Sequence, residues 1–579
     1  MVDRPTAHCQ PTADLLAVIP ESHRVNAIAS PHHELNDPRE QPISRYELWA
    51  IVAITLLGAA VRFAFPSAMA IEHFDEGVYA SNLLFPDQGN EYPNRHLYAP
   101  SLVPALIEWS IILFGDKGIA PMLPSLFFGT LTIPLIWWVG RQWFSPLSGI
   151  AAATLLSLSD FHIAFSRSAL TDVPLCFWLL LAVYLFERAF RDLSWLTAIA
   201  AGFTTSLAWW TKYNGWLPLA ISLSGLLAWS FFASREERHF KQRLVLWGLA
   251  ALTALAVWSP YWWSLPHGYG EVAGNHRQYV VGFPGWWTGF VRQIECQLFS
   301  VRVATGASWI AIFVLVLIQV SPRRSRIWTE QHAAPLPAPA AATDLRLTQA
   351  EWLLAAWFIG LTLTTPLYRP YPRLVLPWMA SACFVMAWLF FGASRFENLR
   401  IPRTVGIVLW FVIMAGSVGL EFLDLPLPRD GLWVTGWQPR TALADLTSQI
   451  QQAIRDDVAR NGGREVGGKR AIVYVFAEPG LFFHLPAHDL AVGPVGDLRF
   501  ADLSASHTRL PTFLIVGPHA DRTPRFRDEF SDRTARLQLI QSWPYAASDF
   551  VLLDQVPPSQ LDAERRKSEV RLYRVRAPE

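Results

Sequence analysis

Two adjacent carboxylates follow the first apolar stretch of the chain and have the residue types of an acid–base site. They are Asp75 and Glu76, in the segment His73-Phe-Asp-Glu-Gly77. Because neighbouring residues cannot share one face of a helix, one carboxylate can face a cavity while the other is held by the protein. Burial at the mouth of an apolar cavity raises a carboxyl pKa towards neutrality, which suits a general base. The competing interpretation is a solvated turn, since Pro66 and Gly77 bracket the segment.

Two further segments place charges at the ends of apolar runs, where each charge costs free energy to keep. Arg167 and Asp172 lie in Ser166-Arg-Ser-Ala-Leu-Thr-Asp172, and they form either a plain interfacial ion pair or part of a site. Lys212 follows another run. Its ammonium group either reaches the lipid headgroups or binds a phosphate.

Two connections between apolar runs hold the remaining charged residues of interest. Residues 264–301 contain His276 and Arg277 beside Gly- and Trp-rich pieces, which indicates either a mobile aromatic lid or an ordinary surface loop. The turn that ends in Tyr371-Pro372-Arg373 is aromatic and basic. It either anchors two spans or clamps a phosphate bidentately.

The composition places these residues in a membrane protein. Of 579 residues, 52% are hydrophobic and 16% are charged, whereas soluble chains carry about 25% charged residues. The net charge of +1 argues against a nucleic-acid-binding protein. Four cysteines, without metal-ligand spacing, exclude a disulfide scaffold or a zinc finger.

The apolar runs predict about eleven membrane spans. They cover 48–65, 119–139, 148–165, 173–190, 195–211, 214–233, 244–263, 302–320, 351–366, 374–392 and 404–423. A further run at 99–115 is interrupted by Pro100 and Pro104 and carries Glu108. If this run does not span, the long basic loops all fall on the cytoplasmic side, as the positive-inside rule requires. We therefore predict an amphipathic interfacial helix at 99–115, a cytoplasmic N-terminus and an outer face that holds all the charged motifs.

The two ends of the chain differ in character from the apolar middle, 45–424. Residues 1–44 are polar and rich in Pro and His, and are expected to form a disordered cytoplasmic tail. Residues 425–579 combine a helical pattern at 442–460 with strand-like runs at 471–476, 512–516 and 550–553. This pattern predicts a soluble α/β domain on the extracytoplasmic face. The chain has no N-x-Ser/Thr sequon, which favours a bacterial plasma membrane.

Taken together, the motifs resemble the GT-C glycosyltransferases, polytopic enzymes that use lipid-phosphate sugars. Within them, the protein O-mannosyltransferases and the lipid A aminoarabinose transferases (glycosyltransferase families 39 and 83) are the most similar. The matching segments are Asp75-Glu76, the proline-containing helix from Tyr98, Ala120–Gly129, Ser166–Asp172, Thr211-Lys212 and Tyr371–Pro377. The chain departs from the family signatures at Leu374, where a Tyr is usual, and near Met122, where an Arg is usual.

The resemblance implies a GT-C-like polytopic fold and an inverting transfer of a hexosyl or pentosyl group. The sugar would move from a polyprenyl-phosphate donor to an acceptor hydroxyl on a protein, lipid or glycan, as in protein glycosylation or lipopolysaccharide modification of the cell envelope. Asp75 would be the base, with Glu76 and Asp172 orienting the sugar or acceptor. The residues implied in substrate or phosphate binding are Arg167, Lys212, His276, Arg277, Tyr371 and Arg373.

Two questions stay open from the sequence alone. The acidic residues can in principle hold a divalent cation, although no metal ligand is assigned. The alternative function is a polytopic lipid or solute transporter or flippase, which would show ionisable residues in mid-span and paired broken helices. The charges here gather at one face, which favours chemistry at the membrane surface.

Overall fold

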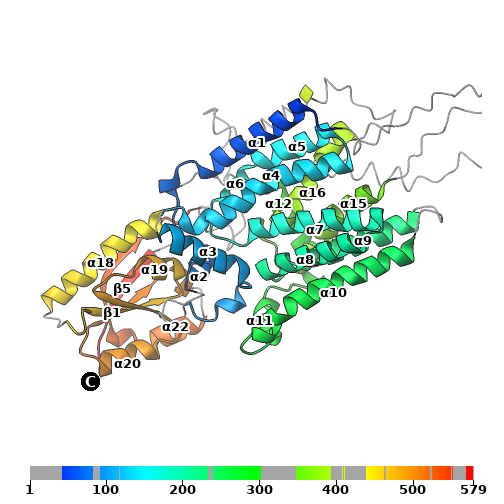
Figure 1. Ribbon diagram of the computed structural model, residues 1–579. Helices are drawn as coiled ribbons and strands as arrows, with labels where there is room; N and C mark the ends of the chain where they lie inside the picture. The colour runs from blue at the N-terminus through cyan, green and yellow to red at the C-terminus, as the bar shows by residue number, and fades with distance from the viewer. Residues whose placement is uncertain are drawn as a thin grey trace, which may run out of the picture. The chain divides into compact units, whose positions relative to one another are not determined.

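The computed structural model describes residues 42–82, 92–116, 118–232, 239–301, 347–392, 407–408, 410, 439–461, 465–521, 524–548, 551 and 569–577. An apolar helical module comes first in the chain, and a domain built on a five-stranded sheet follows it (Figure 1). Apart from residues 42–44, the predicted disordered tail lies outside the described residues.

Helices occupy the predicted apolar runs wherever the structure describes them. Its helices are α1 (Arg45–Phe63), α3 (Leu102–Phe114), α4 (Leu123–Trp143), α5 (Pro146–Ser157), α6 (Asp160–Ser166), α7 (Asp172–Asp192), α8 (Trp195–Thr211), α9 (Leu217–Phe232), α10 (Phe240–Ser264), α15 (Gln349–Thr364) and α16 (Leu376–Ala387). Among the described residues, six helical segments are long and apolar enough to cross a membrane, or seven if the bent pair α5–α6 is one span. The runs predicted at 302–320 and 404–423 lie almost wholly outside the described residues, so eleven spans stays a prediction.

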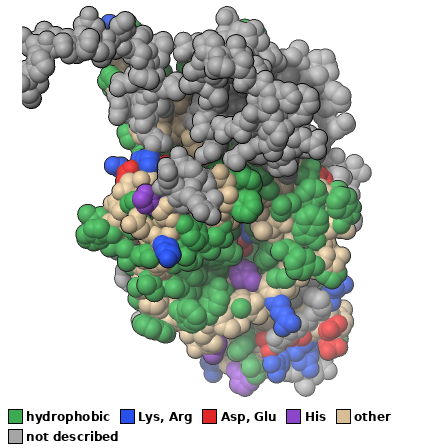
Figure 2. All heavy atoms as spheres, turned by 90° about the vertical axis from the view of Figure 1, so that its right-hand side faces the viewer, with side chains coloured by type: hydrophobic (Ala, Val, Ile, Leu, Met, Phe, Trp, Pro, Cys, Tyr) green, Lys and Arg blue, Asp and Glu red, His purple; other side chains and the backbone are tan. Residues whose placement is uncertain are grey.

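The surface of this module suits lipid rather than water. Large apolar side chains are exposed along α1 and α10, among them Leu48, Trp49, Leu56, Val245, Leu252 and Trp263. Figure 2 shows hydrophobic side chains over much of one face, with charged side chains mainly towards its edges. An exposed apolar surface of this kind is stable in contact with lipid chains.

The predicted run at 148–165 forms two helices instead of one, bent by 62°. Ser159 caps the first turn of α6 with its side chain. The buried Arg62 donates to the carbonyls of Leu156 (3.1 Å) and Ser157 (3.0 Å), at the end of α5. These polar groups satisfy the backbone at the break, so the chain can turn inside an apolar segment.

The predicted interfacial segment forms α3, a helix of 13 residues. At 1.5 Å per residue it measures about 20 Å, shorter than the roughly 30 Å hydrocarbon core of a bilayer. Glu108 is buried, whereas Trp109 and Leu113 on the same helix are exposed. The helix is confirmed, and its position at the membrane surface stays a prediction.

The long connection 264–301 is largely helical. It contains α11 (Tyr269–Arg277) and α12 (Trp286–Val301). Between them the backbone pairs with the turn before α16: Val281 N donates to Leu367 O (2.9 Å) and Arg369 N donates to Tyr279 O (2.7 Å). This segment is therefore attached to the basic turn, and its motion as a lid stays a prediction.

The C-terminal domain is an α/β sheet of mixed direction. Its elements are α18 (Ala442–Arg460), β1 (Ala471–Phe476), α19 (Pro479–His484), β2 (Leu490–Val495), α20 (Arg499–His507), β3 (Thr512–Val516), α21 (Pro518–Asp521), α22 (Pro524–Ser531), β4 (Leu537–Pro544) and β5 (Glu569–Val575). The strand order is β2-β1-β3-β5-β4, with β1, β2 and β3 parallel and β5 antiparallel to both its neighbours. The predicted helix 442–460 and the strands 471–476 and 512–516 are confirmed, whereas the segment 550–553 lies outside the described residues except Val551.

Helices cover both faces of this sheet. One core joins the sheet to α18, and a second core joins its other face to α20 and α22. All five residues of β3 are buried, as expected for an inner strand covered on both sides. The sheet therefore gives the domain a stable core, on which the segments that contact α2 are built.

Candidate functional site

The acidic motif sits at the start of a short helix, α2 (Phe74–Tyr79), closed by a capping box. His73 Nδ1 accepts a hydrogen bond from Asp75 N (3.1 Å), and the Glu76 carboxylate accepts one from His73 N (2.9 Å). These caps satisfy backbone donors that would otherwise be orphaned in the first turn. The two carboxylates consequently lie in different environments: the Glu76 side chain is 0% exposed and that of Asp75 is 14% exposed.

Asp75 pairs with Arg373, from a segment nearly 300 positions later in the chain. Arg373 Nη2 lies 2.6 Å from Asp75 Oδ2, and both side chains are largely buried. Arg373 belongs to the short helical turn η7 (Pro372–Val375) that leads into α16. Its guanidinium also lies over the ring of Tyr371, 5.4 Å from the ring centre. Tyr371 thus supports the cation that neutralises Asp75.

Asp172 forms a second ion pair, with Lys212. Asp172 is the first residue of α7, and Lys212 follows the last residue of the neighbouring helix α8. Lys212 Nζ lies 2.5 Å from Asp172 Oδ1, and the Asp172 side chain is 1% exposed. The other oxygen, Asp172 Oδ2, is buried with no hydrogen-bond partner among the described residues. It is an acceptor that a substrate hydroxyl can use.

The buried phenol of Tyr79 lies within electrostatic range of both ion pairs. Burial raises the pKa of Tyr79 well above its ordinary value. The nearby charges of Asp75 and Asp172 raise it further, while Arg373 acts in the opposite direction. Both carboxylates therefore lie close enough to Tyr79 to act on the same buried phenol.

His276 joins the same site from α11. Its Nδ1 lies 3.3 Å from the hydroxyl of Tyr368, and its Nε2 is buried without a hydrogen-bond partner in the described part of the chain. Burial and the charge of Lys212 lower the pKa of His276, and Asp75 partly offsets them. The ring is therefore neutral at pH 7. It can donate from Nε2 when the Tyr368 hydroxyl donates to Nδ1.

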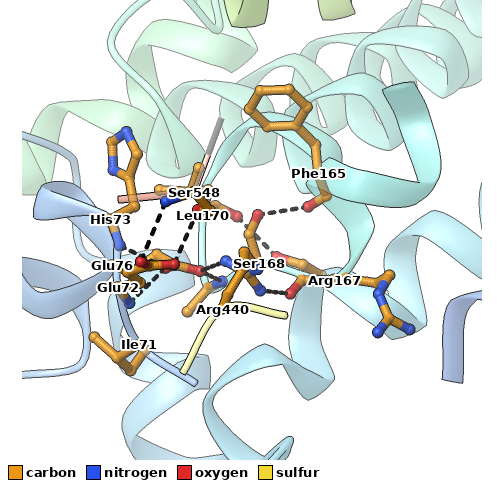
Figure 3. Close-up of polar contacts among 12 residues, drawn as sticks. Ile71, Glu72, His73, Glu76, Phe165, Arg167, Ser168, Leu170, Arg440 and Ser548 are labelled. Atoms are coloured by element: carbon orange, nitrogen blue, oxygen red, sulfur yellow. Dashed lines mark hydrogen bonds and ion pairs between the residues drawn. The ribbon is translucent and has the colours of Figure 1, made fainter. Parts of the chain in front are cut away.

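Three of the residues expected at the site have side chains directed elsewhere. The Arg167 guanidinium donates to the carbonyls of Arg62 (2.8 Å) and Ala64 at the end of α1, and points away from Glu76 (Figure 3). Arg277 is exposed at the end of α11. Glu76 is enclosed by the protein. The structure thus gathers Asp75, Asp172, Lys212, His276, Tyr371 and Arg373, and sets Glu76, Arg167 and Arg277 apart from them.

Two residues around the acidic turn, His73–Gly77, were not singled out in the sequence. Glu72 is buried and accepts hydrogen bonds from Tyr545 Oη (3.1 Å) and Ser548 Oγ (2.9 Å) of the C-terminal domain. Burial raises the pKa of Glu72, although Arg440 and these bonds oppose the shift. Arg440 pairs with Glu76. No pattern in the sequence singles out either residue, because Glu72 precedes α2 and Arg440 lies in a distant segment.

The C-terminal domain packs directly on α2, and Gly77 makes the close approach possible. A Cβ at Gly77 would lie 2.3 Å from the Pro479 carbonyl carbon and 2.4 Å from Gly480 N, at the start of α19. Because these are backbone atoms, they cannot move aside as a flexible side chain can.

We expect Gly77→Ala to destabilise the protein by about 1–3 kcal/mol, as overpacking does. The measurement is the thermal unfolding midpoint of the detergent-purified protein. Gly248→Ala on α10 is the matched control, because a Cβ there meets nothing within 4 Å, and its midpoint should equal or exceed that of the wild type. A Gly77→Ala midpoint as high as that of the control would contradict the close packing.

The described residues do not fit a divalent cation. Each of the three expected acidic residues lies within 3.0 Å of a basic side chain of the protein. No three His, Cys, Asp or Glu side chains gather in a metal-binding arrangement within the described part of the chain. The acidic groups already have cationic partners in the protein.

The chain resembles a known family over part of its length. A family model described as "Dolichyl-phosphate-mannose-protein mannosyltransferase" matches residues 99–263, which include α3 to α10 except for the last residue of α10. No curated protein sequence matches the chain.

Solved structures match almost the whole chain. ArnT from Cupriavidus metallidurans bound to undecaprenyl phosphate gives a TM-score of 0.53 at 14% identity, over 92% of this chain and 99% of that chain. The apo state of ArnT gives 0.51 at 13% identity, over 93% and 100%. AglB from Archaeoglobus fulgidus, in complex with an inhibitory peptide and a dolichol-phosphate, gives 0.48 at 12% identity, over 81% and 69%. The ArnT matches confirm the predicted GT-C-like fold of a multi-pass membrane protein with a C-terminal sheet domain.

Proposed function

We propose that this protein is an integral-membrane glycosyltransferase that moves a sugar from a polyprenyl-phosphate donor to an acceptor hydroxyl, with inversion. The observation that carries the proposal is the pair of buried carboxylate–cation contacts, Asp75–Arg373 and Asp172–Lys212, around one site in a GT-C-like fold. A base and cations are the groups that such a transfer needs.

The donor class follows from the likeness to known proteins. The matching family model is named for dolichyl-phosphate mannose, and the ArnT structure holds undecaprenyl phosphate. Both are polyprenyl phosphates. The acceptor is a hydroxyl group of a protein, lipid or glycan. It enters the site from the side of the membrane on which Asp75 lies.

In the proposed reaction Asp75 takes the proton of the acceptor hydroxyl as its oxygen attacks the anomeric carbon. The bond from that carbon to the phosphate oxygen breaks, and its electron pair leaves with the phosphate. The transition state resembles the oxocarbenium ion of glycoside hydrolysis. Lys212 and Arg373 neutralise the leaving phosphate, so no general acid is required. Attack opposite the leaving group inverts the anomeric centre.

Before the reaction can begin, the two ion pairs of the donor-free site must open so that their cations can bind the donor phosphate. Lys212 and Arg373 are the cations that would bind phosphate, and each already neutralises a carboxylate. A donor phosphate competes for both cations. Its binding at Arg373 releases the Asp75 carboxylate to accept a proton, which couples donor binding to activation of the base.

The proposed site faces the extracytoplasmic side of a bacterial plasma membrane, with the N-terminus in the cytoplasm. This orientation keeps the long basic loops inside. It also places the C-terminal domain outside, where it packs on α2. The comparisons give no support to the transporter or flippase alternative.

The first test is mass spectrometry of lipids that co-purify with wild type and Asp75→Asn. We expect a polyprenyl-phosphate sugar to be enriched with the variant, because it binds donor but cannot activate an acceptor. The recovered lipid is then given to the wild type with candidate acceptors, and NMR reads the anomeric configuration of the product. Ordinary phospholipids alone in both preparations, and no transfer by the wild type from any polyprenyl-phosphate sugar, would overturn the proposal.

A further inference from the structure

Arg440 lies two residues before α18, at the start of the C-terminal domain, and its side chain contacts the acidic turn. Its Nη1 donates to Glu76 Oε1 at 3.0 Å, and its Nη2 donates to the carbonyl of Arg167 (Figure 3). Its backbone N–H donates to Ala68 O at 2.8 Å. The side chain is almost fully buried. One guanidinium therefore connects three segments that are far apart in the sequence.

Glu76 has its hydrogen-bonding capacity filled by the protein. Oε1 accepts from Arg440 and from Ala169 N (2.8 Å), and Oε2 accepts from Glu72 N (3.1 Å) and His73 N (2.9 Å). A carboxylate has about four acceptor positions, so no position is left for a substrate. Burial raises the pKa of Glu76, but Arg440, His73 and the backbone donors outweigh burial and hold it below its ordinary value. The carboxylate is therefore ionised.

The partners of Arg440 and Glu76 belong to the two acidic motifs of the site. Glu76 directly follows Asp75. Arg167 and Ala169 lie in the segment that ends at Asp172, the partner of Lys212. The Arg440–Glu76 pair thus joins the backbone that carries Asp75 to the backbone that carries Asp172.

We propose that Arg440 is a positioning residue of the transferase site, which fixes Asp75 relative to the Asp172–Lys212 pair through Glu76 and the Arg167 carbonyl. The inference rests on the proposed function, because it assigns a role in that same site. It also gives the C-terminal domain a part in catalysis, without any contact between Arg440 and the substrate.

The geometry predicts a specific kinetic pattern for Arg440→Gln. A displacement of about 1 Å at a reacting group lowers the rate by about 10²-fold, so kcat should fall by about that factor. The KM for the donor should stay within about threefold, since uniform binding is retained. The kcat of Arg440→Lys should lie between those of the wild type and Arg440→Gln. An ammonium can bind Glu76, but it has no second nitrogen to donate to the Arg167 carbonyl.

Arg455→Gln is the control for loss of an arginine–carboxylate contact in the same domain, made by a side chain that is 35% exposed. Arg455 lies on α18 and binds Asp489 through two bonds, of 2.9 and 3.0 Å. Among the described residues its side chain bonds to Asp489 and not to the acidic turn, so kcat should stay within about twofold of wild type. The assay uses the donor recovered with Asp75→Asn, and binding of undecaprenyl phosphate is measured in parallel.

Each outcome supports or overturns the positioning role. A kcat of Arg440→Gln within about threefold of wild type overturns it, and so does an equal loss in Arg440→Gln and Arg455→Gln. If Arg440→Gln does not fold, the decision passes to Arg440→Lys, whose kcat must fall while undecaprenyl phosphate binding is kept. A wild type that transfers no sugar refutes the proposed function instead, so the two failures are distinguishable.

Discussion

Asp75→Asn should lower kcat by about 10²–10⁴-fold, the contribution of a general base. The amide keeps the size of the side chain and can still meet Arg373, but it cannot accept the proton of an acceptor hydroxyl. Binding of undecaprenyl phosphate should be retained or strengthened, since Arg373 is no longer held by a carboxylate charge. Single-turnover transfer and equilibrium lipid binding measure the two effects separately.

The matched control is Asp445→Asn, in the first turn of α18. Asp445 lies in the C-terminal domain, and its exposed side chain accepts a hydrogen bond from Thr441 Oγ1 (2.9 Å), so it takes no part in the ion pairs of the site. Its kcat should equal that of the wild type. Full transfer activity in Asp75→Asn would remove Asp75 from the role of base.

Lys212→Met should produce the second large effect, in two separable parts. Loss of the ammonium leaves the buried Asp172 charge unpaired, which destabilises a protein by about 3–5 kcal/mol. Loss of one charge-assisted bond to the donor phosphate should weaken lipid binding by about 10–100-fold. Thermal unfolding and titration with undecaprenyl phosphate measure the two parts.

The double variant Lys212→Met/Asp172→Asn separates stability from binding. With both charges removed no buried ion is left unpaired, so the unfolding midpoint should recover towards that of the wild type. Affinity for undecaprenyl phosphate should not recover. If the double variant binds the lipid as the wild type does, Lys212 is a structural partner of Asp172 and does not bind the phosphate.

The sequence predicted elements best where the pattern is long or strongly apolar. Residues 442–460 have helical periodicity, and 471–476 and 512–516 are short apolar runs, and all three segments have the predicted bounds. Strand β2 was missed because its Gly493-Pro494 reads as a turn. Strand β4 was missed because the polar residues Gln538, Gln541 and Ser542 interrupt its apolar pattern at the edge of the sheet.

The charges at the ends of apolar runs were visible in the sequence, but their partners were not. Lys212 and Arg167 carry the same signal, a cation beside an apolar run. In the structure Lys212 meets Asp172, whereas Arg167 turns to the backbone carbonyls at the end of α1. Arg440 gave no signal, because an arginine before a polar helix is ordinarily solvated. Such pairings depend on packing between segments far apart in the chain, which local patterns do not encode.

The distance along the chain between Glu76 and Arg440 has a consequence for biogenesis. The two residues are 364 positions apart, and Glu72 and Ser548 are 476 positions apart. At roughly 5–20 residues per second, about 20–70 s of synthesis separate Glu76 from Arg440. The first helices therefore enter the membrane before Arg440 and Ser548, which bind the acidic turn and the residue before it, have been synthesised. A nascent or truncated chain has its hydrophobic helices but lacks these contacts, so catalytic competence is acquired only when the last domain has been made and has docked.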